Sequence, residues 1–189
     1  MKTHMLLPLL VLGFSLVSCS EKEIDKIADA QACLDKAAPA EADGCVEKVS
    51  GIESSGADLI RCVGKFVKEG FNDPSKITTA LDALENESDD GNGSLAMMTA
   101  LKFSAEGTAA ANSESADDAF NYCTSANSKG LIFLSGLAKT STFFSTIGPI
   151  STPADLENLM NGNIGNPAAQ EAVGSAINTM YQTNCTNGG

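Results

Sequence analysis

The sequence predicts an all-α fold, built as stacked antiparallel helix hairpins in a single domain that contains disulfides. Alanine-rich segments with apolar residues at helical spacing alternate with short breaks of glycine, proline, asparagine and serine. Several breaks place a capping side chain directly before a proline, which is typical of a helix start: Asp73-Pro74, Thr152-Pro153 and Asn166-Pro167. Alternation of β-branched residues, which would indicate strands, is almost absent.

These breaks divide the chain into helical segments in order. Pro39 and Pro74 mark where the preceding helices end, because the residue before a proline disfavours the helical conformation. We expect helices near residues 21–37, 40–50, 55–70, 74–87, 94–110, 114–127, 129–147, 153–161 and 167–183.

Apolar stripes support these helices. The stripe of the third helix is Leu59, Cys62, Val63, Phe66 and Val67. Comparable stripes are Ile77, Ala80, Leu81 and Leu84 in the fourth, Ala116, Ala119, Phe120 and Cys123 in the sixth, and Val173, Ile177, Met180 and Tyr181 in the last. Residues 131–137 are apolar on almost every side, which predicts a central helix. The paired helices loosely resemble helical-repeat proteins of the tetratricopeptide type, without a fixed period.

The N-terminal segment has the pattern of an export signal. Lys2 and His4 form a polar start, and the apolar stretch from Met5 to Val17 is too short to cross a membrane. The stretch ends in Leu16-Val17-Ser18-Cys19, which resembles the lipobox of bacterial lipoproteins.

This resemblance implies that residues 1–18 are a signal peptide and that residues 19–189 form the mature helical domain. It also implies that Cys19 is the lipid attachment site. Acyl chains such as palmitate on this residue would hold the protein on the membrane, and each buried CH2 group contributes about 0.8 kcal/mol to membrane binding. Ser20, in place of the Asp that retains lipoproteins at the inner membrane, favours the outer membrane. An ordinary secretory signal cleaved around Ser18-Cys19-Ser20 is the alternative.

Composition excludes several classes of function. Removal of residues 1–18 takes one of the 12 basic residues and none of the 24 acidic ones, so the net charge moves from −12 to −13. Such a charge repels nucleic acid, so we expect no nucleic-acid partner. His4 is the only histidine, and its loss excludes Ser-His-Asp and Cys-His catalysis and histidine metal ligation. We therefore expect neither an enzyme nor a cofactor or metal site.

Five further cysteines predict a disulfide framework in an oxidising compartment. Cys33 and Cys45 are equidistant from Pro39, so they face one another across an expected hairpin; two buried free thiols are the alternative. One pair is expected among Cys62, Cys123 and Cys185. We favour Cys62–Cys123, because both lie in the middle of helices, while the other pairings stay open.

Two further features have structural explanations. The acidic segment Glu85–Ser94 could offer oxygen ligands to Ca2+, but it lacks EF-hand spacing, since the twelfth position counted from Asp89 is Ala100. A solvated turn is expected there. Arg61, the only arginine, lies beside Cys62 in an apolar helix, and we expect it to clamp a carboxylate or the carbonyls of a neighbouring helix.

The function predicted on these grounds is a membrane-anchored helical lipoprotein of the cell envelope, acting as a protein-interaction or structural module with an unidentified protein partner. The alternative is a small-molecule or lipid carrier with an apolar pocket between helices, lined by Phe103, Phe133, Phe143, Phe144, Met97 and Met98. A closed apolar cavity would favour the carrier, and an open groove between helices would favour the interaction module. A hydrolase that uses carboxylates alone is the least supported, since no acid pair has a suitable spacing.

Overall fold

A computed structural model describes residues 17–76, 78, 82 and 92–147, and this part of the chain is helical without strands, as the sequence predicts. The elements are α1 (Val17–Leu34), the 3-10 turn η1 (Pro39–Glu41), α2 (Ala42–Val46), the 3-10 turn η2 (Glu47–Val49), α3 (Ser55–Lys68), α5 (Asn92–Leu101), α6 (Ala109–Ser125) and α7 (Lys129–Ile147). Residues 74–76, 78 and 82 are also helical, within the segment expected at 74–87. The helices expected at 153–161 and 167–183 lie outside the described residues.

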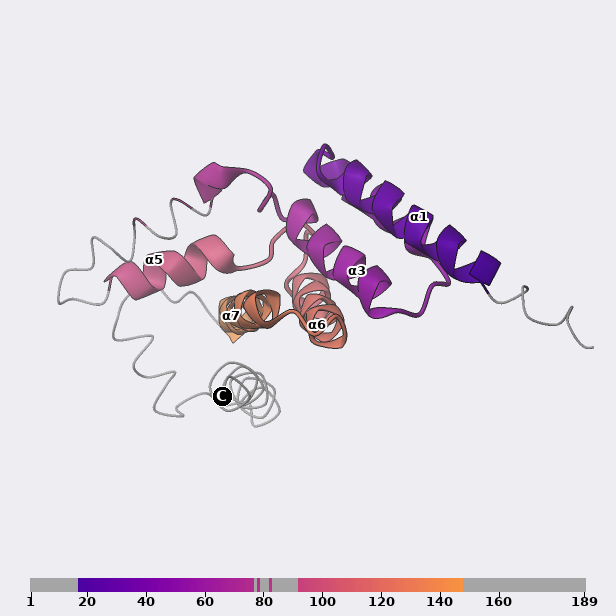
Figure 1. Cartoon of the computed structure of the whole chain (residues 1–189). Coiled ribbons are helices and arrows are strands. Elements are labelled where there is room, and N and C mark those ends of the chain that lie inside the picture. Colours follow the sequence, from indigo (N-terminus) through magenta and orange to yellow (C-terminus); the bar gives the residue numbers. More distant parts are fainter. Residues whose placement is uncertain (1–16, 77, 79–81, 83–91, 148–189) are drawn as a thin grey trace, which may run out of the picture.

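The first unit is a three-segment layer. The chain runs along α1, returns through η1, α2 and η2, and reverses again into α3, so that α1 and α3 lie side by side (Figure 1). Pro39 is the first residue of η1, and Ala38 before it is extended, as the residue before a proline prefers. The return segment, expected as one helix over 40–50, is therefore divided into short helical turns.

Helix α3 occupies the centre of the described part and is buried on two faces. One face joins α1 and α2 in a core cluster that includes Leu34, Val49 and Ile60. The other face joins α5, α6 and α7 in a second cluster around Phe66 and Phe103. The apolar segment at 131–137 lies in α7, which packs on α5 and α6 and leaves Phe133 half exposed.

The end of α3 is closed by a Schellman motif. The backbone N–H of Gly70 donates to the Val67 carbonyl (2.8 Å), and that of Phe71 donates to the Phe66 carbonyl (2.9 Å). Gly70 has a positive φ of 80°. The Phe71 ring then meets the Phe66 ring edge to face, with centroids 5.4 Å apart. The chain is thereby turned away from α3 into the second unit.

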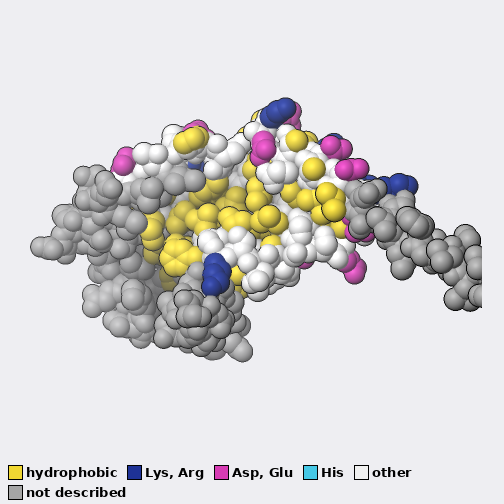
Figure 2. All heavy atoms as spheres, in the orientation of Figure 1, with side chains coloured by type: hydrophobic (Ala, Val, Ile, Leu, Met, Phe, Trp, Pro, Cys, Tyr) yellow, Lys and Arg dark blue, Asp and Glu magenta, His cyan; other side chains and the backbone are white. Residues whose placement is uncertain are grey.

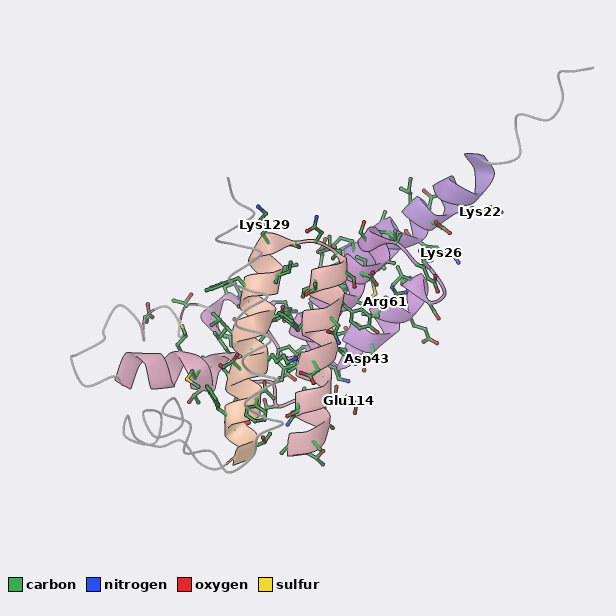
Figure 3. The ribbon with its side chains drawn as sticks, turned by 90° about the horizontal axis from the view of Figure 1, so that it is seen from below. Lys22, Lys26, Asp43, Arg61, Glu114 and Lys129 are labelled. Carbon is green, nitrogen blue, oxygen red and sulfur yellow. A yellow bond between two sulfur atoms is a disulfide. The ribbon has the colours of Figure 1, made fainter. Side chains whose placement is uncertain are left out.

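The second unit is the antiparallel pair α6 and α7, which Figure 3 shows side by side. In Figure 1 the two helices are viewed close to end on, so they cross α3 steeply. The connection is short, because Asn127 takes a left-handed conformation with φ 55° after α6.

One expected helix is wrong in its extent. The segment 94–110 was expected to be helical throughout, but α5 ends at Leu101 and α6 begins at Ala109. Thr108 caps α6, accepting a hydrogen bond from the Ala111 backbone (3.2 Å), and Gly107 before it has a φ of 76°. The break expected near residues 111–113 lies inside α6.

Both disulfides that the sequence favours are present. Cys33–Cys45 joins α1 to α2 with Cα atoms 5.5 Å apart, and Cys62–Cys123 joins α3 to α6 at 5.0 Å. Cys185 lies outside the described residues. The first bond lies within the α1–α2 pair on one flank of α3, and the second joins α3 itself to α6 on the other flank.

Candidate functional site

The polar edge of α3 carries a row of three cations at helical spacing. Arg61, Lys65 and Lys68 lie at i, i+4 and i+7, and we call them the α3 basic row. The sequence points to Arg61 but not to the two lysines, although their helical spacing is a readable signal. The last-turn lysines also complement the negative end of the helix dipole.

Arg61 acts as a clamp for the turn that precedes α3. Its Nη1 donates to Asp58 Oδ1 (2.7 Å), and its Nη2 donates to the carbonyl oxygens of Val49 (3.0 Å) and Ile52 (2.7 Å). The guanidinium also lies 5.8 Å from the centroid of the Tyr122 ring. The structural role expected for this residue is confirmed.

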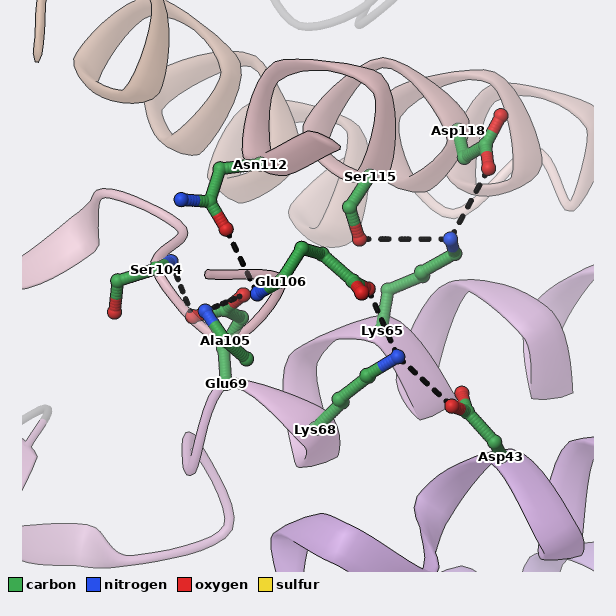
Figure 4. Close-up of polar contacts among 10 residues, drawn as sticks. All are labelled: Asp43, Lys65, Lys68, Glu69, Ser104, Ala105, Glu106, Asn112, Ser115 and Asp118. Carbon is green, nitrogen blue, oxygen red and sulfur yellow. Dashed lines mark hydrogen bonds and ion pairs between the residues drawn. The ribbon is translucent and has the colours of Figure 1, made fainter. Parts of the chain in front are cut away.

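Lys65 ties α3 to α6. Its Nζ donates to Asp118 Oδ2 (3.0 Å) and to Ser115 Oγ (3.5 Å), as Figure 4 shows. Because the Asp118 side chain is 45% exposed, this ion pair is screened by solvent and contributes little stability, about 0.2–1 kcal/mol.

Lys68 joins three segments. Its Nζ lies 2.8 Å from Asp43 Oδ2 of α2 and 2.8 Å from Glu106 Oε1 of the α5–α6 connection (Figure 4). Hydrogen bonds to the Asp43 carboxylate, and then to the Glu106 carboxylate, raise the pKa of Lys68 above its ordinary value. Lys68 therefore stays charged and holds α2 and the connection against α3.

Glu69 explains why the α5–α6 connection is not helical. Its buried carboxylate accepts the backbone N–H of Ser104 (2.7 Å) and of Ala105 (3.0 Å). The next N–H, of Glu106, donates to the Asn112 side chain (2.8 Å). These three donors are the ones a continuing helix would use, so the tertiary contact replaces the helical hydrogen bonds.

A groove of about 360 Å3 runs between the return segment and the α3–α6 pair, and we call it the α2–α6 groove. Its lining residues are Asp43, Val46, Glu47, Ser50, Gly51, Arg61, Gly64, Lys65 and Tyr122. Arg61 and Tyr122 are neighbours in space because each precedes a cysteine of the Cys62–Cys123 disulfide. The volume falls at the lower end of the range for ligand sites.

A second hollow, apolar in character, lies between the ends of α1 and α3. It measures about 450 Å3, and its lining residues are Leu34, Asp35, Val63, Phe66, Val67, Phe71 and Asn72. Figure 2 shows hydrophobic side chains gathered in the middle of one face, with acidic side chains along its upper rim. Leu34, Phe66 and Val67 are already almost fully buried in the two cores, so an occupant would cover little further apolar surface.

The aromatic and methionine residues suggested for a carrier pocket take different positions. Phe103 is 1% exposed inside the larger core and Met97 packs on that core, whereas Phe133 is 50% exposed. Phe143 and Phe144 are adjacent on α7, with ring centroids 6.2 Å apart. The described side chains thus divide between core and surface.

The remaining expected site residues are placed as follows. Cys19 belongs to the first turn of α1. The acidic segment 85–91 lies outside the described residues. Among the residues that the structure describes, no group of three or more His, Cys, Asp or Glu side chains is arranged to hold a metal ion. In that same part of the chain, no helix combines the length and the apolar character needed to span a bilayer.

Comparison of the chain with family models, curated proteins and solved structures yields no match.

Proposed function

We propose that the protein is a lipid-anchored helical module of the bacterial cell envelope that binds another protein, with its anchor at Cys19 and its place at the outer membrane. The anchor is supported by Leu16-Val17-Ser18-Cys19, and the outer membrane by Ser20. Residues 1–18 are the signal peptide and residues 19–189 the mature domain.

The observation that carries the interaction role is the α2–α6 groove, one wall of which is a pair of disulfide-linked helices. Its walls come from α2 and η2 on one side and from α3 and α6 on the other. The Cys62–Cys123 disulfide joins α3 to α6, and Lys68 pairs with Asp43 on the opposite wall. A partner would thus meet a surface that is organised before binding, which lowers the entropy cost of association.

The anchor is tested by Cys19→Ala in a bacterium that processes lipoproteins. The variant should lose labelling by a palmitate analogue and move out of the detergent phase on phase partitioning. Cys185→Ala is the matched control, because it removes a cysteine without touching the lipobox. Unchanged partitioning of Cys19→Ala would refute the anchor.

The interaction role is tested by site-specific photo-crosslinking in intact cells. A photoreactive side chain placed at Ser50, which lines the groove, should give a discrete crosslinked species. The same group placed at Thr146, which is exposed on α7, serves as control. Equal crosslinking from both positions, or none from Ser50, would contradict a partner in the groove.

A lipid or small-molecule carrier is the second proposal, supported by the apolar hollow beside Leu34 and Phe66. A fluorescent fatty acid should then bind saturably, and Val63→Trp should abolish that binding by filling the hollow. Absence of saturable binding would leave the interaction module as the better account.

A further inference from the structure

The two walls of the α2–α6 groove differ in how far their charges are neutralised. On the α3 wall, Arg61 already donates to Asp58 and to two carbonyl oxygens. Lys65 on the same wall already donates to Asp118 and Ser115. An anionic ligand would have to displace these carboxylates, so the α3 wall offers an anion little gain.

The opposite wall has the reverse character. Asp43, Glu47 and Ser50 lie at i, i+4 and i+7 along α2 and η2, and all three are exposed. The Glu47 carboxylate makes no ion pair within the part of the chain that the structure describes. Asp43 is paired with Lys68, but its side chain is 71% exposed and Lys68 is shared with Glu106.

The groove and the ion pairs beside it together have a surplus of negative charge. Asp43 and Glu47 line the groove, and Asp58, Glu106 and Asp118 pair with the cations of the α3 basic row beside it, which gives five carboxylates against three cations. The chain as a whole has a net charge of −12, which draws cationic partners towards it. Tyr122 adds an aromatic surface at the same groove.

We propose that the α2–α6 groove binds a basic peptide segment of a partner protein, with a lysine or arginine side chain placed against Glu47 and its aliphatic stem near Tyr122. The cationic head gains a carboxylate that has no ion-pair partner, and the stem covers apolar surface. This inference rests on the proposed interaction role and names the chemistry of the partner.

Tyr122 provides a built-in reporter of binding. The chain has no tryptophan and two tyrosines, so Tyr181→Phe leaves Tyr122 as the sole tyrosine in the chain. The full-length protein with this substitution, in detergent micelles, would be titrated with an acetylated and amidated pentapeptide of alternating alanine and lysine. Its tyrosine emission should change saturably, and the affinity should fall as salt is raised.

Two charge-matched variants separate the groove from general attraction to an acidic protein. Glu47→Gln should weaken peptide binding at least about fivefold, which corresponds to the loss of one partly screened charge pair. Glu23→Gln on α1 removes the same charge far from the groove and should change the affinity less than twofold. Figure 3 shows the neighbouring Lys22 on the part of α1 that projects away from Arg61. Circular dichroism checks that both variants stay folded.

Several outcomes would overturn the inference. Equal weakening by Glu47→Gln and Glu23→Gln would mean that net charge, and not the groove, attracts the peptide. Three ligands test whether the groove recognises a basic peptide segment. A basic segment as the ligand would be contradicted if a norleucine peptide binds as well as the lysine peptide or if a glutamate peptide binds more tightly. Equal binding of the polyamine spermidine would contradict it as well. If crosslinking at Ser50 persists while the lysine peptide fails to bind, the interaction role stands and this inference fails.

Discussion

The packing of α2 on α3 depends on the absence of a side chain at Gly64. Gly64 is buried, and a Cβ atom added there would lie 2.2 Å from Val46 Cγ2 and 3.9 Å from Leu34 Cδ2. Carbon atoms in contact normally lie about 3.5–4.0 Å apart, so the first approach is a severe overlap. The valine side chain is branched at Cβ and has one strongly preferred rotamer in a helix, so it has little freedom to give way. We therefore expect Gly64→Ala to push α2 away from α3.

The magnitude follows from two opposing effects. Overpacking of this kind costs about 1–3 kcal/mol of folding free energy. Replacing glycine by alanine inside a helix gains about 0.5–1 kcal/mol. Gly44→Ala on α2 is the matched control, because a Cβ at Gly44 would meet no atom within 4 Å. The control measures the helix gain alone, so the two variants should differ by about 1–3 kcal/mol.

Urea unfolding followed by circular dichroism, with the disulfides intact, measures both variants. Val46→Ala supplies the further test, because it removes the overlapping methyl group. Gly64→Ala should cost less in that background, by about 0.5–3 kcal/mol in a double-mutant cycle. If Gly64→Ala stabilises the protein as much as Gly44→Ala does, or if the cycle shows no coupling, the close approach of α2 and α3 is wrong.

Four other predictions address the site and the framework. Arg61→Lys keeps the charge but loses the guanidinium donors to the Val49 and Ile52 carbonyls, so it should lower the free energy of unfolding by about 1–2 kcal/mol. Urea unfolding measures this loss, and the control Lys22→Ala should leave the free energy unchanged. An unaltered urea midpoint of Arg61→Lys would contradict the clamp. Glu69→Gln should release one of the Ser104 and Ala105 backbone amides and speed the hydrogen exchange of these amides. The control Glu114→Gln should leave their exchange unchanged. Unchanged protection of both amides in Glu69→Gln would refute the role of Glu69. Replacing Cys62 and Cys123 by alanine should lower the free energy of unfolding by about 4 kcal/mol, and replacing Cys33 and Cys45 by about 3 kcal/mol, because the Cys62–Cys123 bond closes the longer loop. The reverse order in urea unfolding would argue against this entropic account. The Ser75 backbone N–H donates to the Asp73 carboxylate and lowers the pKa of that carboxyl below its ordinary 3.8. The stabilisation by Asp73 is therefore fully present above pH 3.8 and is lost as the pH falls through the folded-state pKa. The difference in thermal midpoint between the native chain and Asp73→Ala should shrink over that pH range, and a constant difference would contradict this hydrogen bond.

Local chemistry made parts of this structure predictable. The first disulfide followed from two cysteines placed equally far from Pro39, because a hairpin brings such positions together. The role of Arg61 followed from its place beside Cys62 on an apolar helix. In both cases the decisive partners lie within about a dozen residues along the chain.

Longer-range contacts account for the features that local sequence patterns do not predict. The end of α5 at Leu101 depends on Glu69, whose carboxylate takes two backbone donors from more than thirty positions away. Lys65 and Lys68 were readable as a row, but their acidic partners come from other elements. The pairing of Cys62 with Cys123, which the sequence favours from their mid-helix positions, is brought about by the crossing of α6 over α3.

The sequence by itself determined the helical class, most helix positions and the hairpin disulfide, because helical periodicity, caps and turns act over a few residues. Tertiary structure alone decided the α2–α6 groove and the unequal neutralisation of its two walls. Those features depend on the crossing of helices, which is set by close packing such as that of Gly64 against Val46. Such packing joins residues whose spacing in the sequence has no regular relation to their distance in space.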